Sequence, residues 1–223
     1  MKRLFALIMV LTFMLLAGCG SKDPVQDSDP SEGTEMQSAQ EQTETEAVRE
    51  EQIISEDDFV IASLGDGTCE IISCSSTAKV IRVPEILYGE TVVGIGSDGF
   101  NCTEAEQIVL PDTVVYLANN AFNNCDNLKE VDLGSGLKRS GLLSFNACNE
   151  LRSVSFPDGM EEMTECCFGI CEKLGEVYIP ASVTKFGNKI ASLAMCPNVV
   201  IVTPAGSAAE ANAQEYGIPY RNP

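Results

Sequence analysis

The chain of 223 residues contains no histidine and no tryptophan. Without histidine, neither a Ser-His-Asp nor a Cys-His catalytic arrangement can form, and the commonest metal-binding side chain is missing. No glycine-rich segment has the placement of a phosphate-binding loop between a strand and a helix. The acidic cluster of Glu161, Glu162 and Glu165 is expected on a solvated surface. We therefore expect no catalytic activity, no cofactor and no metal site.

Apart from one stretch near the start, the sequence also lacks long apolar runs. That stretch, residues 4–16, is shorter than the roughly 20 residues that a membrane-spanning helix needs. It follows Lys2 and Arg3 and is followed by small residues, which is the pattern of a secretory signal peptide. We therefore expect residues 1–18 to direct export and to be removed.

The end of this stretch, Leu16-Ala17-Gly18-Cys19, resembles the bacterial lipobox. The resemblance implies that Cys19 becomes the first residue of the mature protein and carries a diacylglyceryl group, often with a third acyl chain. Several acyl chains anchor a protein stably, whereas one chain does so only marginally. The expected location is the extracellular face of a bacterial cell membrane. The alternative is an ordinary signal peptide followed by a chance cysteine.

Residues 19–56 have few apolar side chains, many acids and amides, and no aromatic residue. Such a segment cannot bury enough apolar surface to offset the entropy of ordering, so we expect a disordered acidic tether behind the lipidated cysteine. Its acids either bind a basic partner or keep a soluble spacer extended, and the second is commoner. The whole chain has a formal net charge of −19, which predicts repulsion from nucleic acid.

The remaining segment, residues 57–223, contains a repeat of 23 residues. In each unit, two apolar residues one position apart mark a strand, and a proline or glycine follows most of them. These pairs begin at Ile81, Ile108, Val131, Val154, Val177 and Val200. Further apolar positions follow in constant register: Phe122, Phe145 and Phe168; Cys125, Cys148 and Cys171; Leu128, Leu151 and Leu174. Because no unit could bury its apolar side alone, the units must stack around one continuous core.

This register predicts a leucine-rich-repeat solenoid of the α/β class, with about five to six turns. Short parallel β strands should alternate with irregular return segments. The terminal units should differ, since each would otherwise expose the core. At the start, residues 59–61 and 70–72 around Asp66-Gly67 predict a β-hairpin cap, and four extra residues near Tyr88 lengthen the first unit. At the end, residues 207–216 predict a short capping helix.

The repeat resembles the BspA-type leucine-rich repeat of bacterial surface proteins. That consensus reads L-x-x-I-x-I-P, then an apolar pair, then A-F-x-x-C, and residues 128–157 and 151–180 contain it almost whole. The closing segment, residues 204–220, is similar to the family's terminal unit, whereas residues 189–191 depart from the pattern because they lack the phenylalanine. The resemblance implies a surface protein whose partners are matrix proteins, other bacteria or glycans.

Nine cysteines remain when Cys19 is set aside. Those that follow the repeat should form a ladder of small, buried, reduced thiols, although neighbouring rungs could also come within disulfide distance. They are Cys102, Cys125, Cys148 and Cys171. Zinc at Cys166, Cys167 and Cys171 is the less favoured alternative, because the repeat already explains Cys171. Cys69 and Cys74 are an odd number of residues apart in the hairpin, so we expect them on opposite faces and not bridged.

Strand alternation predicts which side chains are left for binding. Residues on either side of the inward-facing Val131 should point away from the core, and the same holds in the neighbouring strands. The candidate partner-binding residues on this concave face are Gln107, Val109, Glu130, Asp132, Ser153, Ser155, Glu176 and Tyr178, with Lys129 and Arg152 at its rim. Tyr178 is the expected aromatic anchor. We expect adhesion or ligand recognition, of a protein or a glycan. The alternatives are a structural role in the bacterium's own envelope and a sheet face that is merely solvated.

Overall fold

The computed structural model describes residues 54–101, 103–164, 166–187, 193 and 196–223. The predicted signal peptide, Cys19 and nearly all of the predicted tether lie outside the described residues, as do Cys102, Glu165 and residues 189–191. Within the described part of the chain, no helix is both long and apolar enough to cross a membrane.

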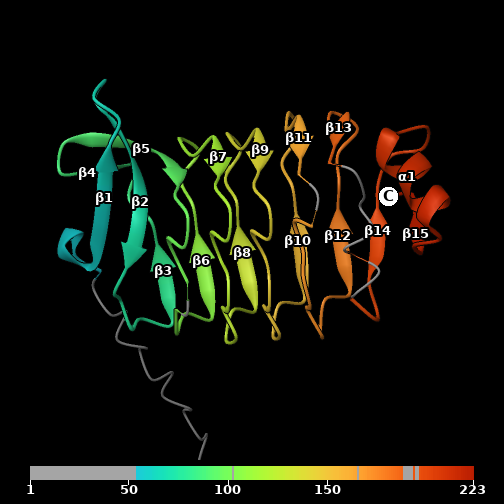
Figure 1. Ribbon diagram of the computed structural model, residues 1–223, viewed down its shortest axis with the longest axis horizontal. Helices are drawn as coiled ribbons and strands as arrows, with labels where there is room; N and C mark the ends of the chain where they lie inside the picture. Colours follow the sequence, from blue (N-terminus) through green and yellow to red (C-terminus); the bar gives the residue numbers. More distant parts are fainter. Residues whose placement is uncertain (1–53, 102, 165, 188–192, 194–195) are drawn as a thin grey trace, which may run out of the picture. The chain divides into compact units, whose positions relative to one another are not determined.

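Short parallel strands, one in each repeat, stack side by side in chain order (Figure 1). They are β3 Val80–Arg82, β6 Gln107–Val109, β8 Glu130–Asp132, β10 Ser153–Ser155, β12 Glu176–Tyr178 and β14 Val200–Val202. Their central residues are in register and face inward, for example Ile81 beside Ile108 and Val154 beside Val177. The predicted leucine-rich-repeat solenoid is therefore confirmed.

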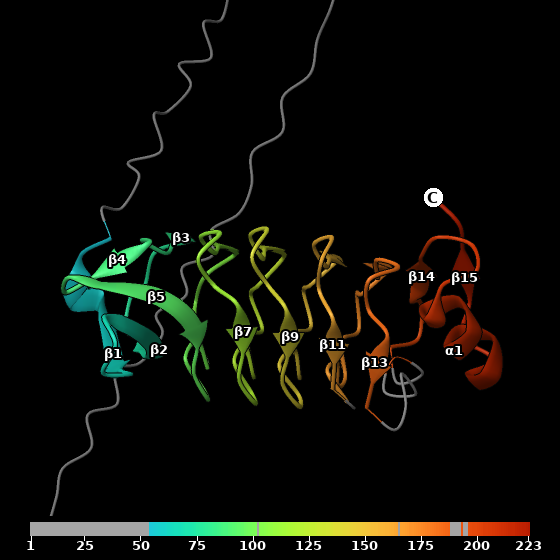
Figure 2. The same cartoon turned by 90° about the horizontal axis from the view of Figure 1, so that it is seen from above.

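The return segments are more regular than the sequence predicted, because they contain a second parallel ladder (Figure 2). Its strands are β5 Glu90–Ile95, β7 Tyr116–Leu117, β9 Arg139–Ser140, β11 Glu162–Met163 and β13 Lys185–Phe186. In each of the last four strands the second residue faces the core, and Leu117 and Met163 are buried. The sequence analysis predicted irregular return segments. In the structure these segments form a second sheet, and only the corners between the two sheets are irregular.

Stacked phenylalanine rings form the centre of the core. Phe100, Phe122, Phe145 and Phe168 are fully buried, and the ring centroids of successive members are 5.5, 5.1 and 5.3 Å apart. Phe156, from the strand side, contacts Phe145 and Phe168 edge-on at 6.5 and 6.1 Å. Offset stacking and edge-on contact are the favourable geometries for aromatic pairs, so each turn is fixed against its neighbours by the same ring.

A ladder of cysteines follows the phenylalanines, and each thiol has a specific partner. The sulfur atom of each cysteine lies within hydrogen-bond distance of a backbone carbonyl oxygen in the preceding turn. These carbonyl oxygens lie at a corner of the solenoid, where no strand amide of the described part of the chain donates to them. The pairs are Cys125 with Phe100 at 3.0 Å, Cys148 with Phe122 at 3.1 Å, Cys171 with Phe145 at 3.2 Å and Cys196 with Gly169 at 3.3 Å. Cys125, Cys148 and Cys171 are thus buried in successive turns, as the sequence predicted, and all four thiols are free.

The environment of these thiols predicts low reactivity. Burial raises the pKa of Cys167 to about 11, and the hydrogen bond with the Cys148 thiol is the largest cause that raises the pKa of Cys171 to about 12. A raised pKa lowers the thiolate fraction, which is the reactive form. With iodoacetamide at about pH 8, we expect fast alkylation of the exposed Cys166 and slow alkylation of Cys167 and Cys171, measured by mass spectrometry. Unfolding in urea should remove the difference, and equal rates in the folded protein would contradict the burial of Cys167 and Cys171.

At the start of the solenoid, β1 Phe59–Ser63 and β2 Thr68–Cys74 form the predicted antiparallel hairpin. The register shifts between Val60 and Ile61, so Cys74, like Cys69, contacts the core. The expectation that these cysteines face opposite sides is therefore wrong, because one bulge residue reverses the alternation. Both thiols are free, as expected.

The extra residues of the first unit form the turn between β4 Ile86–Leu87 and β5. Tyr88 and Gly89 both have positive φ, 52° and 83°, as a tight two-residue hairpin turn requires. The Tyr88 hydroxyl donates to the carbonyl of Glu56, at 2.8 Å, in the short 3-10 helix Glu56–Asp58. The insertion therefore ties the first residues of the folded segment to the hairpin.

At the end, helix α1 Ala208–Tyr216 confirms the predicted capping helix. Ser207 accepts a hydrogen bond from the amide of Glu210, and Gly217 ends the helix with a φ of 65°. Strand β15 Tyr220–Arg221 then pairs with β14. The register of β14 corrects the sequence analysis, because Ile201, and not Val200, pairs with Val177. The last unit is thus one residue longer than the repeat.

The strand sheet is interrupted once, between β8 and β10. In four other turns, the residue after the strand donates its amide to the next strand, as Leu110 does to Asp132 at 2.8 Å. Within the described turns, Leu133 has no such bond to Ser155. The turn after Leu133 has Gly134, with a φ of 64°, where the sequence elsewhere has proline, and the Gly134 amide donates to the Asp132 carboxylate at 3.1 Å. The departure from proline thus coincides with the break.

Candidate binding face

The candidate site is the outward-facing surface of β6, β8, β10 and β12, which we call the strand face. Its residues are Gln107, Val109, Glu130, Asp132, Ser153, Ser155, Glu176 and Tyr178, as the sequence predicted. Five of them are exposed, and Gln107, Val109 and Tyr178 are half-buried. The central residues Ile108, Val154 and Val177 are buried, and Val131 is half-buried against the core. The alternation predicted for this face is therefore present in all four strands.

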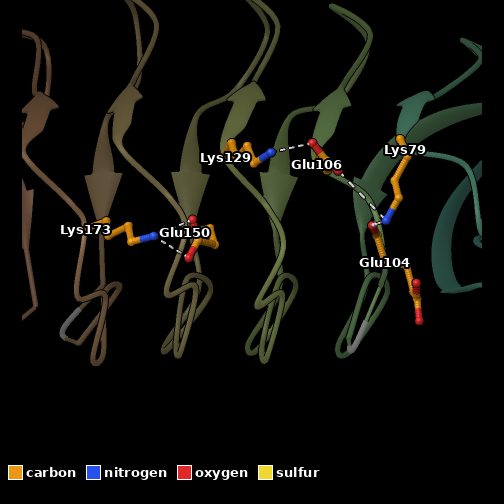
Figure 3. Close-up of polar contacts among 6 residues, drawn as sticks. All are labelled: Lys79, Glu104, Glu106, Lys129, Glu150 and Lys173. Atoms are coloured by element: carbon orange, nitrogen blue, oxygen red, sulfur yellow. Dashed lines mark hydrogen bonds and ion pairs between the residues drawn. The ribbon is translucent and has the colours of Figure 1, made fainter. Parts of the chain in front are cut away.

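The rim of the strand face carries ion pairs between neighbouring turns (Figure 3). Glu106 accepts from Lys129 at 2.5 Å and lies 3.9 Å from Lys79. Glu150 accepts from Lys173 at 2.6 Å, and this hydrogen bond is the largest cause that lowers the pKa of the Glu150 carboxyl. Such exposed pairs contribute little to stability. Their consequence here is electrostatic, because they neutralise charges along the rim.

Two acidic side chains of the strand face also accept hydrogen bonds from side chains of neighbouring strands. Glu130 accepts from the amide group of Gln107, at 3.3 Å, on the β6 side. Glu176 accepts from Arg221, at 2.9 Å, on the β15 side. Strand β10, between them, presents only the hydroxyls of Ser153 and Ser155. The two residues that β10 presents are therefore uncharged, whereas Asp132 on the neighbouring strand β8 is exposed and, among the described residues, accepts only from the Gly134 amide.

Tyr178 is the aromatic residue of this face, as predicted. It pairs in register with Ser155 on one side and Val202 on the other. Partial burial and the negative charge of Asp158 raise the pKa of its phenol, so the hydroxyl stays protonated and can donate a hydrogen bond. The half-buried ring is positioned by the sheet, which reduces the entropy that a contact would cost.

The residues considered for metal binding do not converge. Cys171 contacts the Phe145 carbonyl, Cys167 contacts the Ser144 hydroxyl at 3.1 Å, and Cys166 is exposed. Within the described residues, no group of three or more acids or cysteines is placed to hold a metal ion. Glu161 is exposed, as expected for the acidic cluster, and Glu162 is half-buried in β11.

The sequence analysis did not identify the charged partners Glu106, Glu150 and Lys173. A usable signal exists, because Lys129 follows Glu106, and Lys173 follows Glu150, by one repeat length of 23 residues. In a solenoid, residues one repeat apart lie side by side, so opposite charges at this spacing predict ion pairs. The Arg221 partner of Glu176 lies in the terminal unit, where the repeat no longer applies.

A second polar cluster lies on the other ladder. The Tyr116 hydroxyl donates to Glu70 at 2.6 Å, and the Arg139 guanidinium lies 5.0 Å from the centre of the Tyr116 ring. The ring covers Gly94, where any Cβ would overlap it. Partial burial raises the pKa of Tyr116 to about 12, with the Glu70 hydrogen bond adding to the shift. This cluster joins the hairpin to the repeats, which is a structural role.

Comparison with known proteins agrees with this architecture. The model of the BspA type leucine rich repeat region matches residues 73–202 in six copies. A leucine rich cell surface protein from Faecalibacterium prausnitzii has a TM-score of 0.60 and 25% sequence identity, over 70% of this chain and 40% of that one. A leucine-rich repeat protein from Bacteroides capillosus has a TM-score of 0.50 and 22% identity, over 56% of this chain and 96% of that one, which supports the fold alone. No curated protein matches the chain.

The chain thus spans less than half the length of the Faecalibacterium prausnitzii structure. The family model covers more than half of this chain, and the matched range contains all the strands of the strand face. The protein therefore belongs to the BspA-type leucine-rich-repeat family.

Proposed function

We propose that this protein is a lipid-anchored recognition module of the bacterial cell surface, which binds a protein or a glycan through the strand face. In this proposal Cys19 carries the lipid, residues 19–56 are the tether, and no step is catalytic. The surface location is supported by the lipobox-like Leu16-Ala17-Gly18-Cys19 and by the likeness to a cell surface protein of Faecalibacterium prausnitzii.

The observation that carries the proposal is the regular arrangement of the outward side chains on the strand face. Four strands hold eight outward side chains, two in each strand, and five of these side chains are exposed without contributing to the core. Repeat proteins use such extended surfaces for binding. A polar surface on a rigid support loses little entropy when a partner binds.

A structural role within the bacterium's own envelope is the second candidate, favoured by the same expected lipid anchor. The two functions differ in the source of the partner. Affinity capture from host extract and from the producing bacterium, carried out in parallel with the full chain, should give a specific partner from one source and not from the other.

The strand face is tested by replacing Glu130, Asp132, Glu176 and Tyr178 together with alanine. We expect the affinity for the captured partner to fall by about tenfold or more, because these side chains form most of the charged and aromatic surface. The matched control replaces Glu161, Thr184 and Lys185, which are exposed on the other ladder. Surface plasmon resonance measures both, with circular dichroism to confirm folding. Unchanged affinity in the first variant, or equal loss in the control, would refute the strand face.

A further inference from the structure

Several glutamates on the strand side have polar partners, whereas the exposed Arg152 side chain has none among the described residues. Glu106, Glu150 and Glu176 each have a basic partner, and Glu130 has an amide partner. Among the described residues, the exposed Arg152 guanidinium forms neither an ion pair nor a side-chain hydrogen bond. Glu150 is close enough to feel its charge, but Glu150 is already bonded to Lys173.

The surroundings of Arg152 favour a negatively charged ligand group. Lys129 lies one turn before it, with the Lys129 carbonyl accepting the Arg152 amide at 3.3 Å, and Lys173 lies in the next turn. The positive charges of Lys173, Lys129 and Arg152 all contribute to the lowered pKa of the Glu150 carboxyl. The next residues along the chain, Ser153 and Ser155, are exposed and uncharged. An anion at the start of β10 would meet the Arg152 guanidinium, which has no ionic partner among the described residues. Glu176, in register with Ser153, is already bonded to Arg221, and the negative charge of Asp158 lies at the other end, near the Tyr178 hydroxyl.

The chemical groups on this surface favour a sugar over a peptide as the ligand. A guanidinium binds a carboxylate through two parallel hydrogen bonds, and serine hydroxyls both donate to and accept from sugar hydroxyls. The Tyr178 ring, paired in register with Ser155, can stack on the apolar face of a sugar ring. The exposed large apolar residues of the described chain include none from β6, β8, β10 or β12. The centre of a protein interface is usually its most apolar part, whereas the exposed residues beside Arg152 are two serines.

We propose that Arg152, Ser153, Ser155 and Tyr178 form a subsite for a uronic acid residue of an acidic glycan. Arg152 binds the sugar carboxylate, the serines bind its hydroxyls, and Tyr178 contacts the ring. The proposal rests on the proposed function, because it names the ligand class of the strand face.

The test is calorimetric titration of the full chain in detergent with oligogalacturonate, its methyl ester and an oligoglutamate peptide. The ester has the same sugar rings without charge, and the peptide has the charge without the sugar. We expect oligogalacturonate to bind, and the ester and the peptide each to bind about tenfold more weakly or not at all, the loss expected for one charge-assisted contact.

Arg152→Ala should weaken oligogalacturonate binding by about tenfold, and Arg152→Lys should retain part of it, because lysine keeps the charge but not the paired geometry. Arg82→Ala is the matched control, because Arg82 is exposed on β3 and also lacks an ion pair among the described residues, but pairs in register with Val109 rather than with a serine. Its affinity should be unchanged.

Equal affinity of Arg152→Ala and the unchanged protein would overturn the subsite, as would equal binding of the ester or no binding of oligogalacturonate. Equal binding of the peptide would overturn the assignment to a sugar. The proposed function fails separately, because its variant replaces Glu130, Asp132, Glu176 and Tyr178 and is measured against the captured partner. If that variant loses the partner while Arg152→Ala binds normally, only the uronic acid subsite is lost.

Discussion

Replacing Phe145 with alanine should lower the free energy of unfolding by about 3–5 kcal/mol. The ring is fully buried and stacks on Phe122 at 5.1 Å and on Phe168 at 5.3 Å. Its removal leaves a cavity between two turns and takes away both stacking contacts. Because each turn of a solenoid is stabilised by its neighbours, the loss should extend to the adjacent units.

Urea unfolding of the full chain, followed by circular dichroism, measures this effect. Leu142→Ala is the control, because Leu142 belongs to the same repeat but has 38% of its surface exposed. It should cost less than about 1 kcal/mol. A similarly small loss for Phe145→Ala would show that the phenylalanine column does not form the core.

The second large effect is expected at Gly141, where the backbones of adjacent turns lie too close for a side chain. A Cβ at this position would lie 2.4 Å from the Ala118 carbonyl carbon and 2.6 Å from the Asn119 amide nitrogen. Both are backbone atoms, so no side-chain rotation relieves the overlap. We expect Gly141→Ala to destabilise the protein by about 3 kcal/mol, the upper end of the usual cost of overpacking.

Gly175→Ala is the matched control, since the nearest atom to its added Cβ is the Arg152 carbonyl oxygen at 3.7 Å. This substitution should change the unfolding free energy by less than about 0.5 kcal/mol. The same urea experiment distinguishes the two variants. Equal stability of both would mean that the second ladder is not packed as tightly as the structure describes.

The strands of the first ladder, the phenylalanine column and the cysteine ladder could be predicted because each occurs at a fixed place in a repeat of constant length. The position of Phe145, for instance, follows from Phe122 and Phe168 alone. The register failed where the length changed. Ile201 occupies the core position one residue later than the repeat predicts, and nothing in the apolar run Val199 to Val202 shows which residue points inward.

The second ladder could not be predicted because its strands are only two residues long after β5. Alternation needs several residues to be recognised, and the inward position holds Leu117 in one turn and Ser140 in the next. The ladder exists because stacking places successive return segments within hydrogen-bonding distance, a tertiary effect that no local propensity encodes. The bulge beside Ile61 was missed for the same reason.

The outward direction of the strand-face residues followed directly from alternation, because one inward-facing apolar residue in each strand determines the direction of both neighbours. The pairing of their charges did not follow. Glu176 meets Arg221 because the last strand β15 joins the sheet, and Glu150 is bonded to Lys173 of the following turn rather than to Arg152. These outcomes depend on the competition among side chains in three dimensions.

The most direct test of the account is site-specific photo-crosslinking of the bound ligand to the full chain. A photoreactive amino acid is placed at Ser155, exposed on the strand face, or at Thr184, exposed beside the other ladder, in otherwise identical proteins. The account predicts that the captured partner becomes attached through position 155 and not through position 184. Attachment mainly through position 184 would contradict it, because the strand face would then not be the recognition surface.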